Sequence, residues 1–361
     1  VLAGNAAGRH RLARHLLFIG GTEGGGSLKQ MVCWLLLVTV CGAEPGRAVD
    51  DLFANWRNGP GGAVGVVQND RLVLRRGYGY ADVAHKSAID GATNFDLASV
   101  SKQFCATAVL LLAQQGRLKT SDRLDRWLPG LPAYAAPVRL HHLLSMTSGL
   151  PDYDDSEPTD LAALVQNLRD EQKLTFAPGK RYEYVNLNYA LLTFVVEKAG
   201  GQPFGQFLQQ RIFGPLKMNH TPFLAVRGQP IKNRALGYRR TPRGWVVSRN
   251  DVPGVCDGNV FSNVDDLSLW LRDWLRGSSL LQAGWQQQAW TEKLAGSGYG
   301  YGFEVDEHAG WLRISHTGSW NGTSTYLAMY PQKKLAVVVL SNREEEDVYW
   351  LGEQVEDLYL R

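Results

Sequence analysis

The chain has 361 residues, of which 44% are hydrophobic and 20% charged, with 39 glycines and 15 prolines. This length and apolar share allow roughly two to three structural units with a sizeable core, and they exclude a disordered, a collagen-like or a coiled-coil chain. Residues 1–43 hold four of the 38 basic and one of the 35 acidic residues, so the remaining body is neutral. This balance argues against nucleic acid as a partner.

The first feature in chain order is a short apolar run over residues 32–40, with Lys29 before it and small residues over 41–43. This order predicts a secretory signal peptide over about 28–43, and hence a periplasmic or secreted protein. Nine apolar residues are too few for a bilayer, which needs about 20, so no stable membrane span is expected. We interpret 1–43 as a leader whose first 27 residues precede the true start; an Arg-rich organelle-targeting leader is the alternative.

A single domain over 44–361 is expected to begin with strands. Residues 63–67 and 72–75 are β-rich and flank Asn69-Asp70, which predicts a hairpin. The stretch from Ser99 to Gln115 is nearly all apolar and is followed by Gly116, which predicts a buried helix.

The middle of the chain predicts short helices and loops, and its end returns to strands. Helical content is found at 159–168, 187–199, 204–213 and 264–276, the last opened by a capping box over 262–265. Strands are predicted at 311–315, 324–330 and 335–340, before a final helix over 345–360.

Strands at both ends of the chain predict one sheet built from the two ends. An α/β lobe would take about 50–98 and 291–361, and the mostly helical residues 99–290 would form an inserted lobe. A cleft between two such lobes is a natural place for a site.

Several signatures of other sites are missing. The chain has no Gly-x-Ser-x-Gly and no His-Glu-x-x-His, and its eight histidines form no metal-binding pattern. Cys105 and Cys256 lack metal-ligand spacing, and Cys105 lies in the apolar helix, so a buried free thiol is expected. We expect no metal and no cofactor.

Ser99 and Lys102 begin the predicted buried helix, three residues apart. This spacing places both side chains on one helical face. A serine hydroxyl is a weak nucleophile until a neighbouring base takes its proton, and a buried lysine can be that base. The pattern alone is weak, because Ser99 is also a suitable N-cap and Lys102 an ordinary first-turn residue.

Two further patterns follow, Tyr184-Val185-Asn186 before a predicted helix and His316-Thr317-Gly318 between two C-terminal strands. Alone, the first fits a helix cap with a packed tyrosine, and the second an edge-strand histidine beside a turn. In a chain of this composition, the expected number of chance occurrences of all three patterns in this order is about 0.005.

With these three motifs, the chain resembles the serine β-lactamase and penicillin-binding-protein superfamily. It is most similar to the branch of class C β-lactamases, D-alanyl-D-alanine carboxypeptidases, D-aminopeptidases and related esterases. The segments 95–104 and 142–150 and the pair Pro178-Gly179 resemble the same family, so the likeness covers about 53–343. The resemblance implies a β-lactamase-like α/β fold with an antiparallel sheet flanked by helices.

The resemblance also implies a role for each motif residue. Ser99 would be acylated, Lys102 would help to remove its proton, and Tyr184 would shuttle a proton to the leaving group. Asn186 would bind the substrate amide. The substrate-binding strand would supply His316, Thr317, Gly318 and Ser319. His316 would touch the substrate carboxylate or support Tyr184, and the Ser99 and Ser319 N–H groups would form the oxyanion hole.

The implied function is a serine hydrolase that acts through an acyl-enzyme on amide or β-lactam-type substrates, including cell-wall peptides. His316 stands where most members have lysine, which weakens the case for an efficient β-lactamase. A carboxylesterase of the same fold and a non-catalytic penicillin-binding sensor are the alternatives.

Overall fold

The computed structural model describes residues 45–154, 160–249, 251–344 and 346–361. Ala43–Arg361 forms one compact unit. The predicted signal peptide and the rest of the leader lie outside the described residues. Among the residues that are described, no helix has the length and apolar character to cross a membrane.

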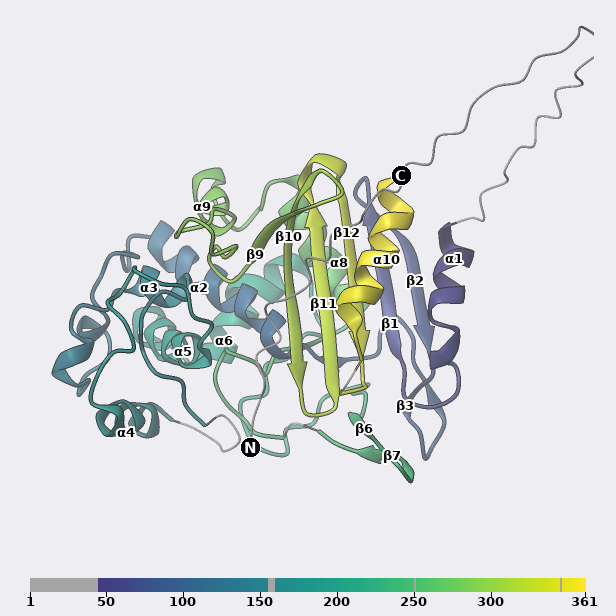
Figure 1. Cartoon of the computed structure of the whole chain (residues 1–361), viewed down its shortest axis with the longest axis horizontal. Helices are drawn as coiled ribbons and strands as arrows, with labels where there is room; N and C mark the ends of the chain where they lie inside the picture. The colour runs from purple at the N-terminus through teal and green to yellow at the C-terminus, as the bar shows by residue number, and fades with distance from the viewer. Residues whose placement is uncertain (1–44, 155–159, 250, 345) are drawn as a thin grey trace, which may run out of the picture. The chain divides into compact units, whose positions relative to one another are not determined.

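A six-stranded sheet with the strand order β2-β1-β12-β11-β10-β9 is the centre of the fold (Figure 1). Every neighbouring pair in it is antiparallel. Two strands come from the start of the domain and four from its end, so the prediction of one sheet built from both ends is confirmed. The strands are β1 Gly62–Gln68, β2 Arg71–Tyr78, β9 Glu304–His308, β10 Trp311–Trp320, β11 Thr323–Tyr330 and β12 Leu335–Ser341.

The predicted hairpin is confirmed by β1 and β2. Asn69 and Asp70, which join them, have φ values of 48° and 68°. Positive φ at both central residues is the requirement of the type I′ turn that suits the strand twist, and asparagine and aspartate tolerate it.

Both faces of the sheet are covered by helices (Figure 1). Along β11, Tyr326, Ala328 and Tyr330 belong to the core beneath α1 (Pro45–Leu52) and α10 (Val348–Leu360). Leu327 and Met329, which alternate with them, belong to the larger core on the other face. This alternation is the two-residue period of a strand buried on both sides.

Helix α8 (Val264–Arg276) has the predicted bounds. Its cap is Asn263, whose side chain accepts a hydrogen bond from the Asp266 N–H at 2.9 Å, one residue beyond the predicted box at Ser262. The helix falls in the range expected for the helical lobe, yet it packs against β1 and β12.

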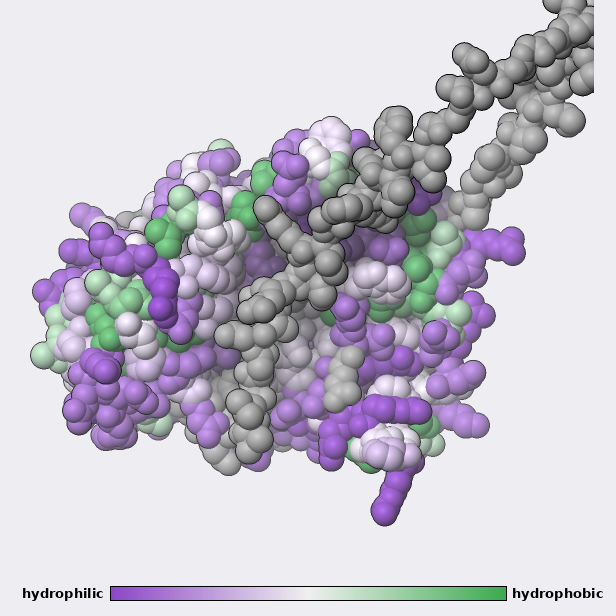
Figure 2. Space-filling model, viewed as in Figure 1, coloured by the Kyte–Doolittle hydropathy of each residue, from purple (hydrophilic) through white to green (hydrophobic). Residues whose placement is uncertain are grey.

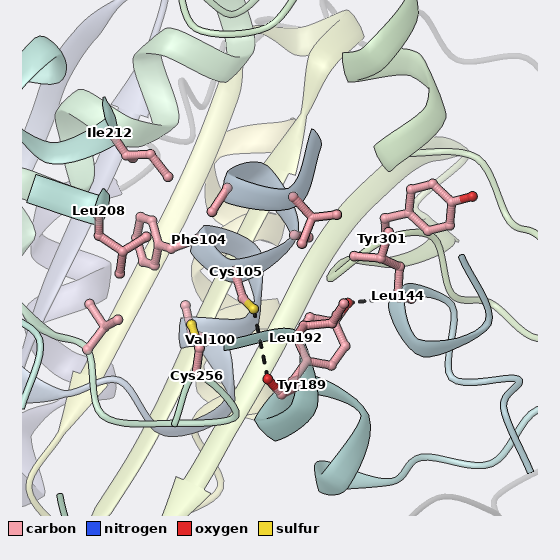
Figure 3. Packing of buried hydrophobic residues seen from close by; sticks show 14 of the residues in the cluster. Val100, Phe104, Cys105, Leu144, Tyr189, Leu192, Leu208, Ile212, Cys256 and Tyr301 are labelled. Carbon is pink, nitrogen blue, oxygen red and sulfur yellow. Dashed lines mark hydrogen bonds between the residues drawn. The ribbon is translucent and has the colours of Figure 1, made fainter. Parts of the chain in front are cut away.

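Helix α2 (Lys102–Gln114) lies at the centre of the helical region and is buried from Lys102 to Ala113. It packs against α5 (Asn186–Gly200), as Figure 3 shows around Cys105 and Tyr189. Cys105 is a buried free thiol, as predicted. The remaining α-helices of the described residues are α3 Leu140–Leu144, α4 Leu161–Glu171, α6 Phe204–Leu208, α7 Gly214–Leu216 and α9 Ala283–Ala289.

In the part of the chain that the structure describes, three short strand pairs were not expected from the sequence. One pair, just before Ser99 in the chain, joins β5 (Phe95–Asp96) to β8 (Phe261–Ser262). The second joins β3 (Tyr80–Asp82) to β4 (Ser87–Ala88), and the third joins β6 (Tyr238–Thr241) to β7 (Gly244–Val247). On the face shown in Figure 2, hydrophilic residues dominate and hydrophobic ones gather in small patches, one of them beside α1 and α10.

Candidate active site

The turn that carries Ser99 is a 3₁₀ helix, Ala98–Ser101, that leads directly into α2. The three-residue spacing places Ser99 Oγ 2.9 Å from Lys102 Nζ. Ala98 has φ +46°, which is strained for a residue with a β-carbon, and its N–H donates to Asp96 Oδ1 at 2.9 Å. The backbone is therefore held in an uncommon conformation immediately before the candidate nucleophile.

Lys102 is fully buried and its amine has three hydrogen-bond partners. Besides Ser99 Oγ, they are Asn186 Oδ1 at 2.9 Å and the Asp257 carbonyl oxygen at 2.7 Å. Asn186 Oδ1 and the Asp257 carbonyl oxygen can only accept hydrogen bonds, so each accepts one from an N–H group of the amine. The third position on the nitrogen faces Ser99, where it can donate a proton or accept one.

Tyr184 and Asn186 lie at the start of α5. Asn186 is its first residue, and the Leu187 N–H donates to Asp152 Oδ1 at 3.0 Å. Tyr184 lies two residues before this helix and is 37% exposed. The centroid of its ring lies 5.1 Å from Lys102 Nζ. The structure thus brings both Ser99 and Tyr184 close to the Lys102 amine.

The predicted position of His316 between two strands is wrong, because β10 continues through Trp320. Residues 316–320 pair with β11 in register, from His316 opposite Leu327 to Trp320 opposite Thr323. Thr317, Gly318 and Ser319 therefore share one strand with His316, and Ser319 is exposed.

The turn before Ser99 is fastened to this part of the sheet. The Thr325 hydroxyl donates to the Leu97 carbonyl, and the Thr323 hydroxyl donates to the Asp96 carbonyl, both at 2.9 Å. These threonines project from β11 and were not identified from the sequence, where no motif marks them. They hold the turn at β10, next to Gly318.

Both ring nitrogens of His316 are engaged inside the protein. Nδ1 lies 2.6 Å from the Thr317 carbonyl oxygen, and Nε2 lies 3.0 Å from the Tyr299 hydroxyl. Burial and the charge of Lys102 lower the pKa of His316 to about 3, so the ring is neutral. His316 therefore offers no fixed positive charge to a ligand.

Sequence reasoning missed four residues around this centre. Tyr299, Tyr189, Tyr153 and Asp257 have no motif spacing that would reveal them. The Tyr153 hydroxyl donates to Asp257 Oδ2 at 2.7 Å. Burial raises the pKa of the Asp257 carboxyl, although Lys102 and this hydrogen bond oppose the rise.

The chemistry of the site is that of hydroxyl, amine and phenol groups. In the described part of the chain, no three histidine, cysteine or acidic side chains gather in a way that could hold a metal ion. A buried amine in contact with a hydroxyl can take its proton and return it, and an exposed phenol beside the amine can exchange protons with a ligand.

The chain is similar in sequence and fold to several known proteins. The model of one protein family, described as Beta-lactamase, matches residues 49–355. The chain is 30% identical to penicillin-binding protein 4* of Bacillus subtilis over 80% of this chain and 69% of that protein. It is 27% identical to protein flp of Staphylococcus aureus, over 82% of this chain and 62% of that protein. The chain thus spans about two thirds of the length of these curated relatives.

A solved structure has the same fold. The octameric penicillin-binding protein homologue from Pyrococcus abyssi superimposes with a TM-score of 0.79 at 24% identity, over 88% of this chain and 76% of that one. The expected α/β architecture, with an antiparallel sheet flanked by helices, is thereby confirmed.

Proposed function

This chain belongs to the beta-lactamase family, and on that premise we propose that it is a serine hydrolase that works through an acyl-enzyme on amide or β-lactam-type substrates. The observation that carries the proposal is the contact of Ser99 Oγ with a buried lysine amine whose other two partners are pure acceptors. Ser99 is the nucleophile and Lys102 its base.

Acylation begins with the transfer of the Ser99 hydroxyl proton to Lys102 as Oγ bonds to the substrate carbonyl carbon. Asn186 and the Asp257 carbonyl keep the amine aimed at Ser99, so little reorganisation is needed. Tyr184, next to the amine and partly exposed, relays this proton from Lys102 to the leaving group as the bond between the leaving group and the carbonyl carbon breaks. Water then attacks the acyl-enzyme and regenerates Ser99.

The negative oxygen that develops during this attack needs hydrogen-bond donors. We assign this role to the backbone N–H groups of Ser99 and Ser319, because β10 runs against the turn that carries Ser99. Each such donor typically contributes about 2.7–4 kcal/mol to the transition state. Asn186, Thr317 and Gly318 line the place of the substrate amide, while Asn186 also holds Lys102.

A second candidate, an esterase of the same fold, is favoured by one observation. His316 is neutral and both its nitrogens are occupied, so it supplies no cation for a substrate carboxylate of the D-Ala-D-Ala type. Esters and amides without a carboxylate next to the scissile bond do not require that charge. A penicillin-binding sensor without turnover remains the third reading.

A panel assay separates these functions. Full-length protein and Ser99→Ala would be compared on a cephalosporin, a D-Ala-D-Ala peptide, its carboxamide and a chromogenic ester. We expect the substitution to abolish turnover of every substrate that is cleaved, together with acyl-enzyme formation seen by intact-protein mass spectrometry. Turnover that survives in Ser99→Ala excludes the proposal, and stoichiometric penicillin labelling without turnover of any substrate supports the sensor.

We also propose that the protein acts outside the cytoplasm, on small molecules or on cell-wall peptides. The support is the predicted signal peptide over about 28–43 and the likeness to a penicillin-binding protein of Bacillus subtilis. The domain arrangement that we propose places the hydrolase in residues 44–361. Fractionation of expressing cells, with N-terminal sequencing of the mature chain, tests both statements.

A further inference from the structure

Tyr299 lies at the centre of the site and in none of the three motifs. Its side chain is fully buried and its hydroxyl lies 3.0 Å from His316 Nε2. Its ring stands at 89° to the Tyr184 ring, with 6.2 Å between the centroids. Its phenol also acts as a hydrogen-bond partner of the Tyr189 phenol, which counteracts part of the rise that burial causes in the pKa of Tyr189.

Two arrangements of protons can satisfy the contact between Tyr299 and His316, and only the second also places a proton between Tyr299 and Tyr189. In the first, His316 carries its proton on Nδ1, and the Tyr299 hydroxyl donates to Nε2. In the second, the proton is on Nε2, so His316 donates to Tyr299 and Tyr299 donates to Tyr189. The Tyr189 hydroxyl donates to the Leu144 carbonyl at 2.8 Å in either case.

The Thr317 carbonyl decides between them. It lies 2.6 Å from His316 Nδ1 and can only accept a hydrogen bond. In the second arrangement, the lone pair of Nδ1 would face the lone pairs of this oxygen at hydrogen-bond distance. Only a proton on Nδ1 makes the contact favourable, and the neutral ring then has an unprotonated Nε2.

We propose that Tyr299 is a positioning residue, which donates its hydroxyl proton to Nε2 and thereby holds His316 in the Nδ1–H tautomer, turned away from substrate. This inference rests on the proposed function, in which Tyr184 passes the proton. His316 then supports Tyr184 and does not bind a substrate carboxylate. The His316 and Tyr184 ring centroids are 6.2 Å apart. Without the Tyr299 hydroxyl, Nε2 becomes an open acceptor that competes for the Tyr184 proton.

Imidazole ¹⁵N spectroscopy of the full-length protein tests the tautomer without any use of activity. Labelled histidine would be read by long-range proton–nitrogen correlation at neutral pH, with His316→Asn to assign the signals. We expect a protonated Nδ1 and an unprotonated, hydrogen-bonded Nε2 for His316. In Tyr299→Phe, the Nε2 signal should move toward the value of a free acceptor. A protonated Nε2 in the unmodified protein overturns the proposal even if no variant folds.

A double-mutant cycle tests whether Tyr299 acts through His316. We expect Tyr299→Phe to lower kcat about tenfold with KM nearly unchanged, and to lower it less than about twofold when His316 is already Asn. Equal losses in both backgrounds, or no loss in either, contradict the proposal. Tyr182→Phe is the matched control, because the Tyr182 ring also packs against Tyr299, with centroids 5.8 Å apart, and should leave kcat unchanged.

The two levels of the hypothesis fail in different ways. If Ser99→Ala keeps its activity, the proposed function fails, whatever tautomer is found. If Ser99→Ala is inactive and His316 carries its proton on Nε2, only the role of Tyr299 fails.

Discussion

A β-carbon at Gly318 would lie 2.3 Å from the carbonyl oxygen of Leu97 and 3.2 Å from the β-carbon of Ala98. Strand β10 therefore runs against the backbone just before Ser99 with no room for a side chain. Gly318 is not among the glycines with positive φ, so space and not backbone conformation requires glycine here. This contact sets the distance between β10, the proposed substrate-binding strand, and the proposed nucleophile.

We predict that Gly318→Ala lowers kcat/KM by about 100-fold, because a displacement of about 1 Å in a catalytic site has an effect of that size. The free energy of unfolding should fall by about 1–3 kcal/mol, as in other overpacked sites. Kinetics and urea denaturation measure the two effects. Gly284→Ala is the control, because nothing lies within 4 Å of a β-carbon at this position in α9. Full activity in Gly318→Ala would show that the close approach is irrelevant.

Lys102 is predicted to contribute to both activity and stability. Lys102→Met should lower kcat by about 10²–10⁴-fold, which is the usual contribution of a general base. It should also lower the free energy of unfolding by about 1–3 kcal/mol, because the buried Asp257 carbonyl loses its donor. Lys119→Met, at an exposed lysine just beyond α2, is the matched control. An inactive variant of normal stability would contradict the structural part of this prediction.

Glu304 is predicted to make stability depend on pH. Burial and the neighbouring Asp306 raise the pKa of this carboxyl to about 7, above its ordinary 4.5. The folded chain then binds this proton more tightly than the unfolded chain, so stability is lost as pH rises from about 4.5 to 7.

Glu304→Gln removes that loss. At pH 4.5, the free energy of unfolding of the variant should equal that of the unmodified protein. At pH 8, it should be higher by about 2–3 kcal/mol. Denaturation curves at the two pH values measure this difference. Glu307→Gln removes an exposed carboxyl from the same strand and is the control. An equal change at both pH values for Glu304→Gln would refute the prediction.

Arg313 is predicted to hold α10 to the sheet. Its side chain is only 3% exposed and contacts Asp306, Glu353 and Glu356, at N–O distances of 2.5, 2.8 and 3.5 Å. Arg313→Met leaves the fully buried Glu356 without its guanidinium, which should lower the free energy of unfolding by about 3–5 kcal/mol.

The control for Arg313 is Arg272→Met. Arg272 pairs with Asp70 at 3.1 Å, with side chains 30% and 42% exposed, so the loss should stay below about 1 kcal/mol. Thermal and chemical denaturation of both variants measures the difference. Similar losses in the two would mean that the buried cluster contributes no more than a surface pair.

The sequence alone determined the features that depend on neighbours in the chain. The turn at Asn69-Asp70 was predictable because these residue types tolerate positive φ, and the bounds of α8 because its cap and apolar period are local. The contact between Ser99 and Lys102 followed from three-residue spacing on a helical turn.

The tertiary structure decided what depends on residues far apart in the chain. The end of β10 at Trp320 is set by pairing with β11, although Gly318 within it predicts a turn. The Asp257 carbonyl and Tyr299 reach Lys102 and His316 only because loops fold across the site. Such contacts leave no pattern in the sequence. Any residue can supply a backbone carbonyl, and a single tyrosine belongs to no motif with a fixed spacing. The sequence therefore predicted the groups to which we assign the reaction, and packing decided which other groups hold and orient them.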